Sequence, residues 1–150
     1  MQQKIEVKIK EGEVETALDV YLGMHEFSSF HRKEEIEDQL KNRQSLILTA
    51  YKDEVAVGFL IGYDKYLDGS FYCWMLGVSP EFRRKGVLTQ LMGYLFTWAL
   101  KNNYEKITLK TRNNRREMLA YLIKNGFNIK NMEINPAIEE NKILFERSLI

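Results

Sequence analysis

The sequence predicts a single α/β domain, spanning residues 1–150, in which a mixed sheet of about six to seven strands packs with about four helices. Three observations predict this class. The 150-residue chain is long enough to bury one hydrophobic core, and it contains no linker rich in proline or glycine. Runs of apolar residues with a period of two are interspersed with runs of helical period. The expected order is β-α-α-β-β-β-α-β-α-β-β.

The first part of the chain predicts one strand and two helices. Residues 5–9 (IEVKI) alternate apolar and charged side chains, which indicates a short strand. Residues 13–24 carry one apolar stripe at helical spacing, formed by Val14, Ala17, Leu18, Tyr21 and Leu22. Residues 32–42 (RKEEIEDQLKN) offer only Ile36 and Leu40 to a core, so the second helix is expected to be lightly anchored.

Three strands are expected in the middle of the chain. Residues 45–51 (SLILTAY) and 55–63 (VAVGFLIGY) are rich in strand-forming residues, and the intervening KDE is typical of a hairpin. Residues 70–78 (SFYCWMLGV) are apolar or aromatic at both alternating sets of positions. This pattern predicts a central strand that is covered on both faces.

The second half continues with two helices and three strands. A helix is expected over residues 87–103, with an apolar stripe of Leu88, Leu91, Met92, Leu95, Phe96 and Ala99. Residues 106–111 predict a strand, and residues 115–127 predict a helix that ends at the glycine Gly126. Two final strands are expected within residues 127–134 and 141–149.

Composition excludes several classes of function. Twenty-two Lys and Arg against 21 Asp and Glu give a formal charge of +1, which argues against a dedicated nucleic-acid binder. The single cysteine, Cys73, lies in an apolar strand and predicts an inert thiol, and two isolated histidines are too few for a metal site. The start MQQKIEVKIK resembles neither a signal peptide nor a membrane anchor, so a cytoplasmic protein is expected.

The phrase VSPEFRRKG, residues 78–86, joins the central strand to the helix that follows. Pro80 has no N–H to donate and biases Ser79 towards extended geometry, so the strand is expected to detach from its neighbour near Val78. Backbone groups left unpaired there need a partner, such as an extended molecule that carries amides.

Three cations, Arg83, Arg84 and Lys85, precede the helix, which is expected to begin at Gly86 or Val87. The first N–H groups of a helix are a ready phosphate site, whereas cations there oppose the helix dipole unless an anion is bound. The alternative is a solvated loop before an amphipathic helix. An extended amide-bearing ligand that ends in phosphates has the shape of coenzyme A.

The residues LGVSP, followed by RRKGVL, resemble the signature of the GNAT superfamily of acetyl-CoA-dependent N-acyltransferases. Arg83 and Gly86 stand at its two anchor positions, and the later REMLAYLIKNGF is similar to the family's next motif. The resemblance covers essentially the whole chain, because the expected order of elements is also the family's. It implies a GNAT-like fold.

The resemblance also implies a cofactor site. Backbone groups around Gly77 and Val78 would hold the pantetheine arm, and an N–H near Val78 would polarise the thioester carbonyl. Backbone amides of residues 84–89 would cradle the pyrophosphate. The implied acetyl-CoA-binding residues are Gly77, Val78, Arg83, Arg84, Lys85, Gly86, Val87, Leu88, Thr89 and Asn114.

Two positions of the cofactor motif depart from the family pattern. Leu88 stands where the family usually has glycine or alanine, and it can serve there if its side chain faces the core stripe. The asparagine often found at the start of the next helix is displaced. Arg115 takes the matching position, and Asn113 and Asn114 precede it.

The general acid is not obvious from the sequence. Many family members carry a tyrosine four residues before the glycine of Gly-Phe, where this chain has Leu122. Tyr121 is adjacent, but a rotation of about 100° per residue turns it away from the stripe of Leu119 and Leu122. Tyr121 is the candidate acid, and the alternative is a half-exposed surface tyrosine.

A general base is equally hard to choose. The central strand carries no acid, because Tyr72, Trp74 and Leu76 occupy the face in question. Asp64 and Asp68 lie in the preceding turn, and Asp68 is the candidate that could act through water. The alternative is that both aspartates serve the turn geometry of YLDGS.

A further group lies between the first two helices, a region that shapes the acceptor pocket in related proteins. His25, Glu26 and His31 stand there, and a histidine can act as a base near neutral pH. Aromatic residues could wall the pocket or simply pack in the core; these are Phe27, Phe30, Tyr72 and Trp74.

The function expected from the resemblance is transfer of an acetyl group from acetyl-CoA to a primary amine of a small molecule or peptide. The alternative is a GNAT-like module that binds acyl-CoA without transferring the acyl group, which the missing tyrosine and strand acid favour. Binding to nucleic acid through the arginines is disfavoured, because no aromatic residues interleave with them. A homodimer is compatible with the apolar C-terminal half.

Overall fold

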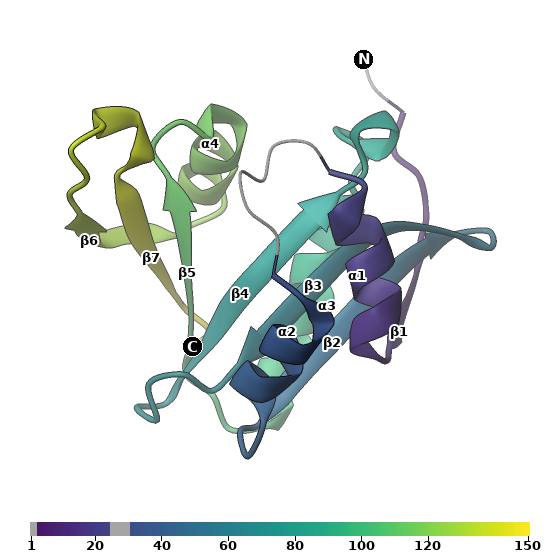
Figure 1. The fold of residues 1–150 in the computed structure, drawn as a ribbon, viewed down its shortest axis with the longest axis horizontal. Helices are drawn as coiled ribbons and strands as arrows, with labels where there is room; N and C mark the ends of the chain where they lie inside the picture. The colour runs from purple at the N-terminus through teal and green to yellow at the C-terminus, as the bar shows by residue number, and fades with distance from the viewer. Residues whose placement is uncertain (1–2, 25–30) are drawn as a thin grey trace.

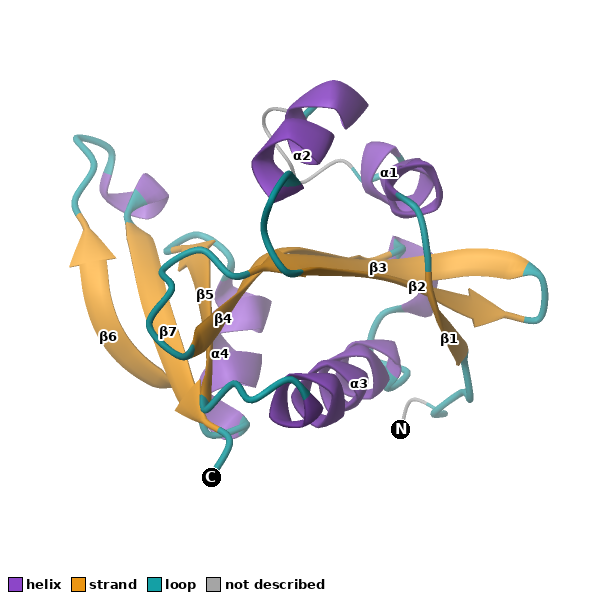
Figure 2. Cartoon of the chain, turned by 90° about the horizontal axis from the view of Figure 1, so that it is seen from below, coloured by secondary structure: helices purple, strands orange, loops and turns teal. Residues whose placement is uncertain are grey.

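The described part of the chain forms a mixed sheet of seven strands, with helices on both of its faces (Figures 1 and 2). The structure is a computed structural model that describes residues 3–24 and 31–150. The strand order in the sheet is β1-β2-β3-β4-β5-β7-β6. The strands are β1 Lys8–Glu11, β2 Ser45–Lys52, β3 Val55–Tyr63, β4 Ser70–Val78, β5 Lys106–Arg112, β6 Asn128–Glu133 and β7 Lys142–Ser148.

The helices lie in two layers, one on each side of the sheet. They are α1 Val14–Leu22, α2 Lys33–Leu40, α3 Val87–Lys101 and α4 Arg116–Lys124, with short 3₁₀ turns η1 at Pro80–Phe82 and η2 at Ile138–Glu140. In Figure 2, α1 and α2 lie on one side of β2, β3 and β4, and α3 lies on the other. The predicted fold class and order of elements are confirmed.

Each helix layer buries its own apolar cluster against the sheet. On the α3 face, the larger cluster includes Leu91 and Leu95 of α3 and Leu122 of α4. On the α1 face, the smaller cluster includes Ala17 of α1 and Ile36 of α2. We call these two sides of the sheet the α3 face and the α1 face.

The first strand begins later than the sequence predicts. The alternating residues 5–9 were expected to form it, but β1 starts at Lys8 and pairs with β2 from there. The N–H of Ile5 instead donates to the Lys85 carbonyl, before α3, at 2.9 Å, and the N–H of Val7 donates to Oε1 of Gln90, in α3, at 3.1 Å. A period of two predicts extended backbone but not the neighbour with which that backbone pairs.

Within residues 3–24 and 31–150, no helix combines the length and the apolar character that crossing a bilayer requires.

Candidate active site

The sheet opens between β4 and β5. These two strands pair in parallel only from Ser70 to Cys73 and from Lys106 to Leu109. Beyond that point β4 stays paired with β3 and β5 stays paired with β7, so the two strands diverge (Figure 1). We call the space between the diverging strands, from Trp74 to Val78 on β4, the gap.

Pro80 does not cause this opening, contrary to the prediction from sequence. The strand was expected to detach near Val78, but the N–H of Ser79 still donates to the Val57 carbonyl at 2.8 Å. The parting is from β5 rather than from β3, and it begins at Trp74. The proline ends the strand only after β4 has run the whole length of the gap.

A bulge in β4 coincides with the start of the gap. The partner of Gly62 is Cys73 and the partner of Ile61 is Met75, so Trp74 is the extra residue. Bulges bend a strand and change the direction of its side chains, and they are frequent beside active sites. Strict alternation would place Leu76 on the same face as Trp74, but Leu76 packs on the α3 face and Trp74 packs on the α1 face.

The hydrogen-bond ladder determines which backbone groups of β4 face the gap. Ser79 and Val57 form a hydrogen-bonded pair, and such pairs alternate along an antiparallel ladder. Gly77 therefore directs its N–H and C=O towards β3, whereas Leu76 and Val78 direct theirs towards the gap. Leu76 replaces Gly77 in the set of residues that we propose for the pantetheine arm and thioester.

Gly77 has a packing role instead. A Cβ atom at this position would lie 2.6 Å from the Sδ and Cε atoms of Met24 and 3.0 Å from the Phe59 ring. The glycine thus lets the side chain of Met24, two residues after the end of α1, lie directly on β4 beside the gap. The sequence motif does not reveal the direction of each peptide group, which depends on the hydrogen-bond ladder between β3 and β4.

The residues between η1 and α3 form a loop with two left-handed positions. Arg84 has φ 61° and Gly86 has φ 87°. The backbone bond from Gln90 N to Gly86 O, at 3.2 Å, is the first of the α3 ladder, so the amides just before Gln90 have no intrahelical acceptor. They lie at the positive end of the α3 dipole, and this arrangement suits a phosphate.

Leu88 does not disturb this loop. Its side chain is partly buried and packs against the main cluster on the α3 face, next to the fully buried Val87. The condition under which a leucine can replace glycine or alanine here is therefore met. Thr89 is exposed beside it, at the outer side of the first turn.

The three predicted cations have separate positions. Arg83 Nε donates to the Val78 carbonyl at 2.9 Å, which holds the loop against the end of β4. Lys85 Nζ lies 5.6 Å from the centre of the Phe82 ring. Arg84 pairs with Glu117 of α4, and both side chains are largely exposed. Exposed ion pairs contribute little, so a phosphate can take the place of Glu117 at Arg84.

Further arginines gather where the gap opens. Arg115 immediately precedes α4, and burial lowers the pKa of its guanidinium, with additional contributions from Arg112 and Arg83. Arg112 pairs with Glu140 at 2.6 Å. The exposed Asn114 donates its backbone N–H to the Glu139 carbonyl at 2.9 Å, so the loop before α4 is tied to η2.

Tyr121 lies between α4 and α3. Its hydroxyl is 3.1 Å from Thr89 Oγ1, whereas Leu122 is fully buried in the main cluster. Thr89 belongs to the first turn of α3, where the phosphates are expected. Tyr121 therefore lies at the phosphate end of the expected cofactor rather than beside Trp74 or Leu76. Its role as general acid stays a prediction, and that role would require the hydroxyl to leave Thr89.

This position makes a kinetic prediction for Tyr121→Phe. Loss of one hydroxyl contact at the phosphate end should raise KM for acetyl-CoA by roughly twofold to tenfold, with little change in kcat. A general acid would show the opposite pattern, a large fall in kcat and a changed alkaline limb of the pH–rate profile. Steady-state kinetics over a range of pH separates the two roles.

Asp64 and Asp68 lie at the other end of β4 from the gap. Asp68 Oδ1 accepts hydrogen bonds from the Ser70 N–H at 3.0 Å and from the Ser70 hydroxyl at 2.5 Å, and these bonds lower the pKa of the carboxyl. Asp64 accepts from Leu67 N and from the Tyr104 hydroxyl. The structure gives both aspartates roles in the turn, and our proposal does not use Asp68 as a base.

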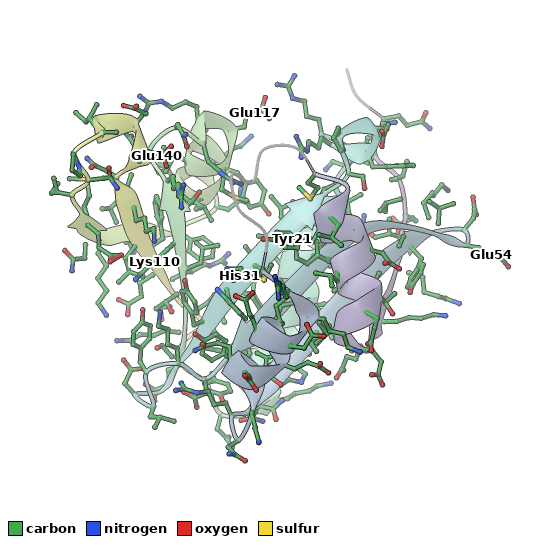
Figure 3. All side chains as sticks on the ribbon, in the orientation of Figure 1. Tyr21, His31, Glu54, Lys110, Glu117 and Glu140 are labelled. Carbon is green, nitrogen blue, oxygen red and sulfur yellow. The ribbon has the colours of Figure 1, made fainter. Side chains whose placement is uncertain are left out.

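His31 lies beside the gap on the α1 face. Its ring centre is 5.2 Å from that of Trp74, and the backbone N–H of His31 donates to the Tyr21 hydroxyl at 3.1 Å. Glu35 Oε2 is 3.8 Å from His31 Nδ1. Figure 3 shows His31 and Tyr21 close together over β4. The other candidates of this region, His25, Glu26, Phe27 and Phe30, lie outside the described residues.

Two other kinds of chemistry find no support in the site. Burial raises the pKa of the Cys73 thiol to about 12, so this cysteine is neutral and unsuited to nucleophilic attack. Across residues 3–24 and 31–150, no cluster of three or more His, Cys, Asp and Glu side chains is placed to hold a metal ion.

The chain belongs to the acetyltransferase (GNAT) family, whose family model matches residues 14–127. Members of this family are acyltransferases that use acetyl-CoA as the donor, and so is this protein. The alternative of a binding module without transferase activity is therefore not retained.

Solved structures share the fold along nearly the whole chain. Ard1 from Thermoplasma volcanium has 21% identity and a TM-score of 0.83, over 97% of this chain and 99% of that one. The ribosomal-protein-S18-alanine N-acetyltransferase from Escherichia coli has 16% identity and a TM-score of 0.78, over 96% and 94%. A GNAT family acetyltransferase from Elizabethkingia anophelis with acetyl-CoA bound has 19% identity and a TM-score of 0.75, over 97% and 99%. No curated protein sequence matches the chain.

Proposed function

We propose that the protein transfers the acetyl group of acetyl-CoA to a primary amine, which attacks the thioester directly in the gap. The observation that carries this proposal is the gap itself, with the peptide groups of Leu76 and Val78 directed into it. An extended pantetheine arm can bond to those groups as a strand would. The loop before α3 then lies at the phosphate end of the same ligand.

The two substrates approach from opposite sides of the sheet. The loop that would receive the phosphates leads into α3, so the cofactor belongs to the α3 face. The rest of that face is filled by the main apolar cluster. An acceptor amine must then reach the thioester from the α1 face, where Trp74 and His31 lie.

The proposed reaction has a simple balance of bonds. The amine lone pair forms the C–N bond, and the negative charge that develops on the carbonyl oxygen is stabilised by the N–H of Leu76. The C–S bond then breaks, and coenzyme A leaves as the thiolate with the electron pair. The proton lost by the amine passes to the His31 imidazole, directly or through one water.

Support for an amine acceptor comes from proteins of the same fold. The Escherichia coli structure is named for an alanine N-acetyltransferase, and another neighbour, of 15% identity, is an aminoglycoside 6′-N-acetyltransferase in complex with coenzyme A. These acceptors differ in size and charge. The class common to them is a primary amine, and we propose no narrower one.

A thiol-release assay tests the proposal. With acetyl-CoA present, free coenzyme A should accumulate only when a primary amine is added, from a panel of amino acids, diamines and short peptides. Mass spectrometry should show one acetyl group on the amine. Release of coenzyme A at the same rate without amine would contradict transfer, because the thioester would then be going to water.

A further inference from the structure

Residues 4–7 run beside the loop that precedes α3, not in the sheet. The N–H of Ile5 donates to the Lys85 carbonyl at 2.9 Å, one residue before Gly86. Ile5 and Val7 also pack, partly buried, against the main cluster on the α3 face. We call residues 4–7 the strap. The strap therefore brings residues near the start of the chain into contact with the proposed phosphate loop.

One side chain, Gln90, fixes the strap to the loop. Its Nε2 donates to the Ile5 carbonyl at 2.8 Å, and its Oε1 accepts the Val7 N–H at 3.1 Å. The same Nε2 donates to the Gly86 carbonyl at 3.2 Å. A primary amide has two N–H groups and one carbonyl oxygen, and all of its polar atoms are used here.

The loop needs such a support, because its own conformation is unfavourable. Arg84, which is not glycine, has φ 61°, a conformation that costs free energy for an L-residue. Gly86 has φ 87°. The exposed pair of Arg84 with Glu117 adds little to its stability. A loop that must first be ordered binds its ligand more weakly than one already in shape.

We infer that Gln90 is a positioning residue for acetyl-CoA: by clamping the strap onto the loop, it holds the amides of residues 84–89 ready for the phosphates. The inference rests on the proposed phosphate loop. Gln90 itself does not touch the cofactor, because all polar atoms of its amide bond to protein backbone. Its contribution should therefore appear in cofactor affinity and not in the chemical step.

The test replaces Gln90 with methionine, which is similar in length and cannot form these bonds. Kd and KM for acetyl-CoA should rise about tenfold, the loss expected when a preorganised loop becomes mobile. The kcat at saturating acetyl-CoA and the KM for the amine should not change. Without ligand, amide hydrogens of residues 84–89 should exchange faster than in the wild-type protein.

A matched control separates positioning from general destabilisation. Gln39→Met removes a side-chain hydrogen bond to the Tyr63 hydroxyl, 3.1 Å long, on the α1 face. It should leave the acetyl-CoA affinity unchanged. Ile5→Pro removes the N–H that donates to Lys85 and should weaken acetyl-CoA binding in the same way as Gln90→Met, through a change that lies outside α3. It keeps the inference testable if Gln90→Met fails to fold.

The outcomes are distinct. Failure of the wild-type protein to bind acetyl-CoA would reject the phosphate loop, and the strap with it. If the wild-type protein binds acetyl-CoA normally and Gln90→Met or Ile5→Pro has the same Kd as the wild-type protein, the positioning role of the strap is rejected and the phosphate loop is not. The same would follow if Gln39→Met weakened binding as much as Gln90→Met, or if kcat fell while KM for acetyl-CoA stayed constant.

Discussion

Replacing Gly86 with glutamate should abolish measurable binding of acetyl-CoA, while Gly86→Gln should bind it more weakly but detectably. In both variants an L-residue must adopt the φ of 87° found at Gly86, which costs about 1–2 kcal/mol of folding free energy. Both have room, because a Cβ there would lie 3.6 Å from the Lys4 side chain. Only glutamate brings a negative charge to the point where phosphates are expected, so the difference between the two variants reports the charge.

Calorimetric titration with acetyl-CoA gives the affinities, and thermal unfolding followed by circular dichroism controls for folding. The two variants should unfold at nearly the same temperature, because they share the backbone strain. If Gly86→Glu bound acetyl-CoA as tightly as Gly86→Gln, no phosphate would lie near this residue, and the assignment of the loop would be wrong.

Replacing His31 with glutamine should lower kcat by roughly 10² to 10⁴, the usual contribution of a general base. Glutamine keeps polar atoms beside Trp74 but cannot accept the proton. KM for acetyl-CoA should stay within about twofold, because His31 lies on the α1 face, away from the loop that leads into α3.

Glu35→Gln is the companion variant for this prediction. Glu35 lies 3.8 Å from His31 Nδ1 and can orient the imidazole without touching the acceptor. Its replacement should reduce kcat less than the loss of His31. A His31→Gln enzyme with the wild-type kcat would show that the proton goes elsewhere.

The order of strands and helices could be predicted from sequence, because each element carries its own apolar period. The place where the sheet opens could not. It depends on the bulge at Trp74 and on the early end of the pairing between Cys73 and Leu109. A bulge leaves no mark in a strand that is apolar on both faces, and strict alternation therefore misplaced Leu76. Pro80, from which the sequence analysis predicted the opening, lies beyond the gap.

Part of the candidate site could also be predicted from the sequence, and part could not. The loop from Arg83 to Gly86 was predictable, because cations and a glycine before a helix are a local pattern. Gln90 was not, since its partners Ile5 and Val7 lie 85 and 83 residues away along the chain. Such a contact can be identified only from the structure, in which residues 4–7 lie outside the sheet and beside α3.

The placement of acetyl-CoA in the gap can be tested by following backbone amide signals by NMR while acetyl-CoA is added to the wild-type protein. We expect the amides of Leu76, Val78 and residues 84–89 to shift together with a single Kd. Gly77, whose peptide groups face β3, should shift less than Leu76 and Val78. Saturable shifts located elsewhere, with the amides of Leu76 and Val78 unchanged, would contradict the placement of the thioester in the gap.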